Sequence, residues 1–329
     1  MALKMSLPAS RRDVFRLGGV LLIGGTVLSN SSCGSPPGSD SDELFITIAT
    51  GGQSGVYYPV GSAMSTIFKD ELDAKASVEA TGASVDNINL LHKENVELAI
   101  IQSDAASQAY NGDAPFDEEI QSFSAVASLY PQYVQLIALK KSGIESVTDI
   151  EGKRVSVGAP NSGVELNART IVKGYGLSYD DFKVQNLSYA ETVDGMQNGT
   201  VDAGFFTSGI PNPSVTEVMQ QTNIEVVPID GSAADKLEQE YDYFDKTVIP
   251  GGTYQNTDDV PALSFANILV ASNKLDDDTV YKMTKAMWDN IDAIHDSNAA
   301  AKDITLNTAK GSVPIKFHPG AQRYYSEQS

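Results

Sequence analysis

Short β-rich runs alternate with helical patterns along the chain from Leu44 onward. Such alternation is typical of α/β folds, in which helices connect the strands of largely parallel sheets. The runs predict strands over residues 45–49, 76–80, 98–102, 125–129, 134–139, 154–158, 184–187, 203–207, 225–229 and 264–271. We therefore expect an α/β fold.

The length of the chain favours two lobes. A single hydrophobic core stops growing near about 250–300 residues, and this chain has 329. No long linker divides residues 43–329, so we expect lobes joined by crossing strands, with the segments 123–141 and 262–273 as candidates. The predicted first lobe is discontinuous and comprises residues 43–131 and 272–329, and the predicted second lobe comprises residues 132–271.

The clearest helical pattern covers residues 279–295, where apolar residues recur at spacings of three and four. Three aspartates at 276–278 precede it, and acidic residues suit a helix N-terminus. Trp288 lies within this pattern, and we expect it to pack in the core rather than stack on a ligand.

The chain is strongly acidic, with 43 acidic and 23 basic residues and a formal charge of −20. A field of this sign repels nucleic acid and anionic lipid surfaces, so we expect no nucleic-acid partner. The acidic residues are scattered along the chain, which is typical of a solvated surface.

The first residues resemble a bacterial export signal. Basic residues including Arg11 and Arg12 precede an apolar run over 17–28, which is too short to span a bilayer because a spanning helix needs about 20 residues. The single cysteine, Cys33, follows Ser31 and Ser32 as in a lipoprotein processing site. The export route, general or twin-arginine, stays open at this point.

These features predict a signal peptide over residues 1–32, a lipidated Cys33 that anchors the protein to the membrane, and a flexible linker over residues 33–42. The alternative is cleavage near Ser32, which would leave a free thiol. Both readings place the functional part outside the cytoplasm, in the periplasm or at the cell surface.

Four predicted strand ends carry small polar residues in place of charged ones, over residues 50–59, 80–84, 102–104 and 158–165. In open α/β sheets, ligands bind beyond the carboxyl ends of strands, where helix N-termini direct N–H groups at an anion. Structural roles compete with ligand binding, since Ser84 and Asp104 could each cap a helix. The candidate ligand-binding residues are Gly52, Ser54, Tyr57, Gln102, Ser103, Asn161, Ser162, Gly163 and Thr207, with Glu165 and Arg169 as weaker candidates.

Several short motifs occur in a fixed order through these stretches. They are Thr50-Gly51-Gly52, Tyr57-Tyr58-Pro59, Thr81-Gly82, Gln102-Ser103-Asp104, Ala109-Tyr110-Asn111-Gly112, Asn161-Ser162-Gly163 and Glu165-Leu166-Asn167-Ala168-Arg169. Together they resemble the TAXI family, the solute receptors of tripartite ATP-independent periplasmic (TRAP) transporters, over residues 43–300.

The resemblance implies a two-lobed, type II-like periplasmic-binding-protein fold with two crossing strands between the lobes. It also implies a small solute, often a carboxylate such as glutamate, and membrane permease subunits as partners. The chain departs from the family pattern at residues 53–56 and at Val164, where hydroxyl-bearing residues are more usual. Loss of a hydroxyl that faces a ligand can change substrate choice strongly, so the identity of the solute stays open.

An enzyme is the first rival interpretation. The run 52–56 is similar to a nucleophile elbow, but Val56 occupies the place of its second glycine. Each of the three histidines fits a structural or solvated role better than that of a general base. They are His92, His295 and His318. We therefore expect no catalytic residues, no metal and no cofactor.

The second rival is a solute-sensing lipoprotein that reports its ligand to a membrane signalling partner. Such a sensor binds and closes as a transport receptor does, and only the neighbouring genes would separate the two. In both cases we expect a monomer.

Overall fold

The computed structural model describes residues 43–328. Its strands are β1 (Phe45–Ala49), β2 (Lys75–Glu79), β3 (Leu98–Gln102), β4 (Phe123–Leu139), β5 (Arg154–Ser156), β6 (Lys183–Gln185), β7 (Ala203–Ser208), β8 (Ile224–Val227), β9 (Asp245–Ile249) and β10 (Val260–Ser272). The α-helices are α1 (Tyr57–Leu72), α2 (Ser84–His92), α3 (Ser103–Asn111), α4 (Gly163–Gly174), α5 (Tyr189–Gln197), α6 (Pro213–Gln221), α7 (Gly231–Glu240), α8 (Asp277–Asp289), α9 (Ile291–His295) and α10 (Pro319–Glu327). Three short 3-10 helices are η1 (Lys140–Ser142), η2 (Val147–Ile150) and η3 (Ala299–Asp303).

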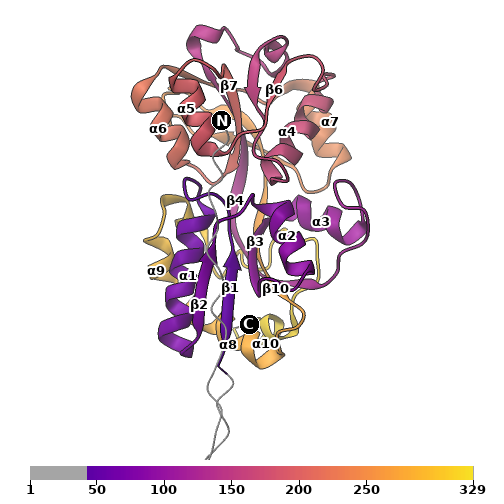
Figure 1. Cartoon of the computed structure of the whole chain (residues 1–329), viewed down its shortest axis with the longest axis vertical. Helices are drawn as coiled ribbons and strands as arrows, with labels where there is room; N and C mark the ends of the chain where they lie inside the picture. Colours follow the sequence, from indigo (N-terminus) through magenta and orange to yellow (C-terminus); the bar gives the residue numbers. More distant parts are fainter. Residues whose placement is uncertain (1–42, 329) are drawn as a thin grey trace, which may run out of the picture. The chain divides into compact units, whose positions relative to one another are not determined.

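The strands form one sheet of ten strands in the order β2-β1-β3-β10-β4-β7-β5-β6, with β8 beside β4 and β9 beside β10. β1 runs parallel to β2 and β3, and β5 runs parallel to β6 and β7. The two halves of this sheet belong to two lobes. Figure 1 shows α1–α3 and α8–α10 around β1–β3, and α4–α7 around β5–β7.

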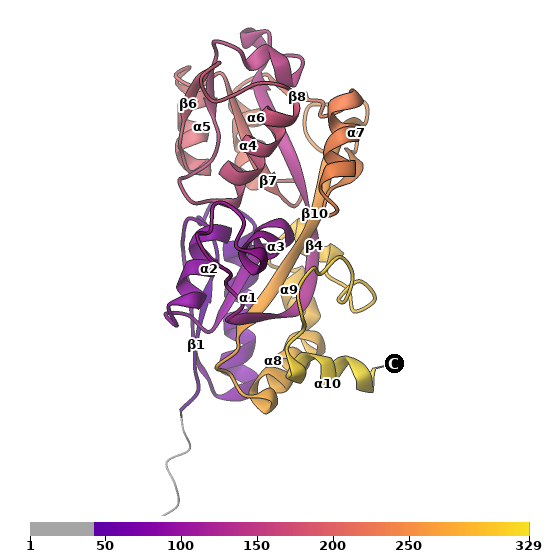
Figure 2. The ribbon, with the colours of Figure 1, turned by 90° about the vertical axis from the view of Figure 1, so that its right-hand side faces the viewer.

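The lobes are joined by β4 and β10, which are 17 and 13 residues long and run antiparallel to each other. In the first lobe, Ala271 of β10 pairs with Leu98 of β3. In the second lobe, Leu136 of β4 pairs with Phe205 of β7. Figure 2 shows the two strands running side by side from one lobe into the other. The predicted α/β, two-lobed fold with two crossing strands is confirmed.

Each lobe buries its own apolar residues. Cores of the first lobe include Ile48, Met64, Leu98, Leu269 and Met287. Those of the second include Leu136, Val155, Ile171, Phe205 and Leu263. Because β4 and β10 belong to both lobes, the exact boundaries after residues 131 and 271 remain a prediction.

Some strand predictions were wrong in detail. Residues 125–129 and 134–139 belong to one continuous strand, β4, which passes through Pro131. Pro131 lies opposite Ala266, just before a register irregularity in β10, so the missing N–H falls where the ladder is already interrupted. The strand β9 was not predicted, because its run Asp-Lys-Thr-Val-Ile begins with two charged residues. β4 and β10 run antiparallel to each other and to every strand that they pair with, unlike the parallel pairs among β1–β3 and among β5–β7.

The helix expected over residues 279–295 is two helices, α8 and α9, which meet at Asn290. Asp276 accepts hydrogen bonds from the N–H groups of Asp278 and Thr279, so an aspartate caps α8 as expected. Trp288 packs in the first-lobe core, and its Nε1 donates to Tyr325 OH at 3.2 Å. Within residues 43–328, no helix combines the length and apolar character needed to cross a membrane.

Candidate functional site

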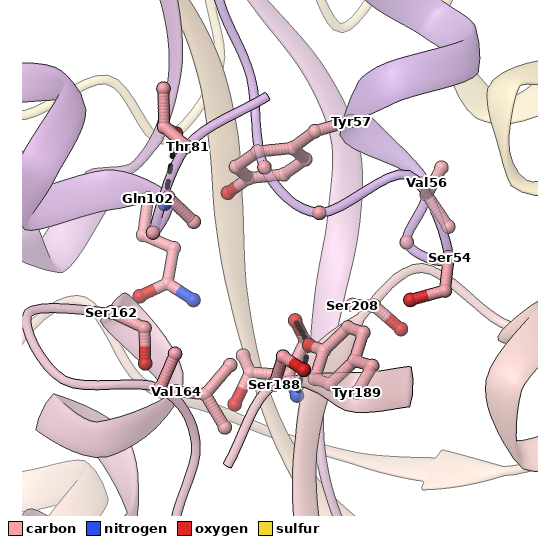
Figure 3. Close-up of a pocket in the computed structure, with 18 residues that line it drawn as sticks. Ser54, Val56, Tyr57, Thr81, Gln102, Ser162, Val164, Ser188, Tyr189 and Ser208 are labelled. Carbon is pink, nitrogen blue, oxygen red and sulfur yellow. Dashed lines mark hydrogen bonds between the residues drawn. The ribbon is translucent and has the colours of Figure 1, made fainter. Parts of the chain in front are cut away.

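A cavity of about 90 Å³ lies between the lobes, beyond the carboxyl ends of β1, β3 and β7. The first lobe contributes residues 51, 52, 54–57, 81–83 and 102, and the second lobe contributes residues 159, 162–164, 188, 189, 207 and 208. None of these lining residues is charged. Figure 3 shows labelled side chains from the two lobes facing each other across this space.

Five helices begin at the cavity wall, because their first residues or N-caps line it. The first turns of α4 and α5 are capped by side chains, since Ser162 accepts from Glu165 N–H and Ser188 accepts from Glu191 N–H. The N-cap residues of α1, α2 and α3 make no such side-chain hydrogen bond. A helix N-terminus carries partial positive charge and free N–H donors. The first-lobe wall of the cavity therefore suits an anion, although it holds no cationic side chain.

A buried asparagine holds this wall together. Asn87 of α2 donates through Nδ2 to Thr50 O at 2.6 Å and to Ile100 O at 2.8 Å. Thr50 directly follows β1 and Ile100 lies in β3. Asn87 thus fixes the strand ends from which the loops of the cavity start.

Two buried polar atoms in the cavity wall have no hydrogen-bond partner, and they come from opposite lobes. Gln102 of β3 is 2% exposed and its Oε1 is unpaired, while Thr207 of β7 is 4% exposed and its Oγ1 is unpaired. A buried polar atom without a partner costs about 1–3 kcal/mol. A ligand that bonded both atoms would remove this cost and would hold the lobes together.

Two tyrosines form the more apolar part of the wall. The hydroxyl of Tyr189 donates to Thr207 O at 2.8 Å and accepts from Thr207 N–H at 3.1 Å, which fixes the backbone of Thr207. Tyr57 OH accepts from Gln132 Nε2 at 2.5 Å. Burial raises the pKa of both phenols far above the usual value, so both are neutral donors and acceptors.

The lobes also contact each other directly around the cavity. Ser214 Oγ donates to Ser54 O at 2.9 Å, and Asn167 Nδ2 of α4 donates to Asp104 Oδ2 of α3 at 2.7 Å. Asp86 N–H of α2 donates to Asn161 O at 3.3 Å. The structure therefore has the lobes in contact around the cavity.

The structure brings seven of the nine candidate residues to the cavity wall, and these are Gly52, Ser54, Tyr57, Gln102, Ser162, Gly163 and Thr207. Ser103 is buried at the start of α3 and does not line the cavity. Asn161 has a positive φ of 58° and an exposed side chain, so its backbone makes the inter-lobe contact. Their role in binding remains a prediction for all nine.

The weaker candidates and the two proposed caps lie elsewhere. Glu165 and Arg169 form an ion pair on α4, and the Arg169 guanidinium lies over the Tyr179 ring rather than at the cavity. Ser84 does not cap α2, since its Oγ accepts from Gln102 N–H at 3.1 Å. Asp104 does not cap α3, because it lies within the first turn and bonds Asn167.

Sequence reasoning missed Ser188 and Tyr189 in the cavity wall. The sequence did contain a signal for Ser188. Ser188 follows a predicted strand and precedes Glu191 by three positions, which is the capping-box pattern of a helix N-terminus. Cys33 lies outside the described residues, so its lipidation remains a prediction.

Comparison with solved structures supports the same fold at low sequence identity. MatC from Rhodopseudomonas palustris with bound malate is 12% identical, with 88% of this chain and 98% of that chain covered and a TM-score of 0.55. PhnD1 from Prochlorococcus marinus in complex with methylphosphonate is 12% identical, with coverages of 78% and 90% and a TM-score of 0.53. A binding protein component of an ABC phosphonate transporter from Pseudomonas aeruginosa is 14% identical, with 80% of each chain covered and a TM-score of 0.51.

The sequence also matches a family model, and the match covers most of the folded chain. The model is that of the NMT1-like family, and it matches residues 48–329. Every segment that lines the cavity falls within this range. The chain belongs to the NMT1-like family.

Proposed function

We propose that this chain is an extracytoplasmic solute-binding receptor of a membrane transporter, with no catalytic activity. The observation that carries the proposal is the pair of buried residues, Gln102 and Thr207, which line one cavity from two lobes and each hold an unpaired polar atom. A solute that bonds both makes more contacts when the lobes are together. Such a solute shifts the population toward the closed state, which a membrane partner can recognise.

A small carboxylate is the solute class that fits this wall best. A carboxylate accepts up to about four hydrogen bonds, and the uncapped starts of α1, α2 and α3 offer N–H donors. The Gln102 amide can add an N–H donor of its own, because its oxygen and nitrogen exchange places by rotation of the amide. The cavity of about 90 Å³ favours a compact acid of the size of glutamate or malate.

The two crossing strands indicate where the hinge between the lobes lies. β4 and β10 carry the chain between the lobes, and β10 has register irregularities between Ala266 and Ile268 and between Leu269 and Val270. A bulge disrupts the ladder locally and bends its strand. We therefore place the hinge at this level of β4 and β10.

The ordered motifs at residues 50–59, 102–104 and 161–163 support a TRAP permease of the TAXI type as the membrane partner. The structural similarity to a component of an ABC phosphonate transporter makes an ABC transporter the alternative membrane partner. Uptake by vesicles that contain the candidate permease separates the two. A TRAP partner requires an ion gradient and no ATP, whereas an ABC partner requires ATP.

Thermal unfolding of the full-length protein with a panel of solutes tests the binding function. The panel contains L-glutamate, malate and methylphosphonate, with L-glutamine as an amide control. A ligand that binds only the folded state raises the melting temperature. We expect at least one carboxylate to raise the melting temperature of the wild type. The same carboxylate should raise that of Gln102→Ala far less. The proposal fails if no acid in a broad panel shifts the transition, or if the variant responds as the wild type does.

A further inference from the structure

A carboxylate and an amide meet at the lobe interface beside the cavity. Asp104, in the first turn of α3, accepts a hydrogen bond from Asn167 Nδ2 of α4 at 2.7 Å. Both side chains are 1% exposed. Because α3 belongs to the first lobe and α4 to the second, this contact exists only while the lobes are together.

Each of these side chains has a second oxygen that lacks a partner. Asp104 Oδ1 and Asn167 Oδ1 are both buried without a hydrogen bond. Two acceptors cannot bond each other, so an ionised Asp104 leaves both of them unpaired. One proton on Asp104 Oδ1, donated to Asn167 Oδ1, would pair both oxygens at once. A carboxylic acid and a primary amide then make two reciprocal hydrogen bonds.

We propose that Asp104 and Asn167 form a proton-binding site between the lobes, and that closure of the receptor takes up one proton there. The proposal deepens the receptor function and rests on it for the meaning of closure. The chemistry is a simple protonation, with no bond made or broken other than that to the proton.

The surroundings of Asp104 explain why closure changes its protonation. Desolvation by burial is the largest influence and raises the pKa of Asp104 to about 7, although N–H groups of the helix start and the Asn167 amide favour the carboxylate. When the lobes separate, Asp104 returns to water at a helix N-terminus, where an aspartate has its ordinary pKa of about 3.9 or below. Closure therefore takes up a proton between about pH 4 and pH 7.

Among the described residues, no charged side chain contributes to the raised pKa of Asp104. Tyr57 and Tyr243 interact with it electrostatically, but burial raises the pKa of both phenols, so both stay neutral. The other titratable or charged residues on the surrounding elements are Asp86 and His92 of α2, Tyr110 of α3, and Glu165, Arg169 and Lys173 of α4. Glu165 and Arg169 pair with each other, and Asp86 accepts from Gly82 N–H.

The sign of the pH effect follows from the raised pKa. The closed, folded state binds one proton more than the open or unfolded state between about pH 4 and pH 7. Its stability is therefore full at low pH, is lost as the pH rises toward 7, and is level above that. The substitution Asp104→Asn mimics the protonated acid, because its amide can donate to Asn167 Oδ1 while its oxygen still accepts from Asn167 Nδ2.

Urea unfolding of the full-length protein from pH 5 to pH 8.5, with wild type and Asp104→Asn compared, tests the proton site without any solute. Relative to the variant, the folding equilibrium constant of the wild type should fall by up to about tenfold per pH unit between pH 5 and pH 7, and then level off. Parallel profiles for the two proteins overturn the proposal. A solute can still bind in that case, so the result leaves the receptor function intact.

Small-angle scattering of the ligand-free protein tests the link to closure. We expect the wild type to have a larger radius of gyration at pH 8 than at pH 5.5, and Asp104→Asn to keep the smaller value at both. A wild type whose radius changes no more than that of the variant contradicts the link. Should the variant not fold, the carbon-13 carboxyl resonances of aspartate-labelled wild type answer the question: one aspartate must titrate above pH 6.

Discussion

Gly163, the first residue of α4, lies against the side-chain amide of Gln102, and a Cβ at position 163 would overlap that amide. The two residues belong to different lobes. The glycine is needed here because a side chain of one lobe and the backbone of the other approach each other closely, and not because of an unusual backbone angle. This contact sets how near the lobes can come at the cavity.

Gly163→Ala should therefore weaken solute binding more than it weakens the fold. The added methyl group must push Gln102 aside or hold the lobes apart, and either change removes contacts that a bound solute makes. We expect the affinity for the carboxylate found by thermal screening to fall by about tenfold or more, as isothermal titration calorimetry would measure.

Gly311→Ala is the matched control for that substitution. A Cβ at Gly311 would meet only the Thr308 carbonyl oxygen, at 3.3 Å, and Gly311 does not line the cavity. Equal losses of affinity in the two variants would show that the contact between Gly163 and Gln102 has no special part in binding.

The unpaired hydroxyl of Thr207 leads to a second prediction. Thr207→Val keeps the shape of the side chain and removes its unpaired hydroxyl from the cavity wall. Without solute, the loss of an unpaired buried polar atom should leave stability unchanged or slightly raised. With solute, the affinity should fall by about 1–3 kcal/mol, because a polar group of the ligand loses its partner.

Calorimetry and urea unfolding of the same variant separate these two effects. Thr216→Val serves as the control, since Thr216 of α6 does not line the cavity and its Oγ1 donates to Asn212 O. Unchanged solute affinity in Thr207→Val would remove this hydroxyl from the binding site.

A third prediction concerns the stability of the second lobe. Arg154 at the start of β5 donates from Nε to Asp202 Oδ2 at 2.9 Å and from Nη2 to Asp202 Oδ1 at 2.5 Å. The bonds from the Arg154 side chain lower the pKa of the Asp202 carboxyl. A lowered pKa gives stability that is present above the ordinary value near 3.9 and is lost as the pH falls through the lowered one.

Asp202→Asn should accordingly have a lower urea midpoint than the wild type at pH 7, and the difference should shrink below about pH 4. Asp194→Asn, on the exposed side of α5, should change the midpoint little at either pH. A difference between Asp202→Asn and the wild type that stays constant from pH 7 to pH 3 would contradict the ionic role of the pair.

Much of the fold could be predicted from periodicity, because each lobe repeats local α/β units. β1 and β3 have the predicted bounds, since β1 is followed by a glycine-rich loop and β3 by the polar residues that begin α3. Pro131 misled the prediction of β4. A proline interrupts a ladder locally, yet pairing with β10 on both sides carries the strand through it. Similarly, the apolar spacing of α8 continues into α9, although the backbone bends at Asn290.

The candidate site was predictable where chemistry and backbone position coincide. Gln102 and Ser162 stand directly at strand and helix ends, so their types and places both indicated a ligand. Ser103 also stands at a helix start, but it is buried and does not line the cavity. The pairing of Asp104 with Asn167 joins residues 63 positions apart in different lobes, and only the tertiary structure could reveal it.

The position of the solute is best tested by a crystal structure of the full-length protein with the tightest-binding carboxylate of the panel. We expect the carboxylate between the lobes, within hydrogen-bond distance of Gln102, Thr207 and N–H groups at the starts of α1–α3. A solute bound elsewhere, or bound in the cavity with neither Gln102 nor Thr207 among its polar contacts, would contradict it.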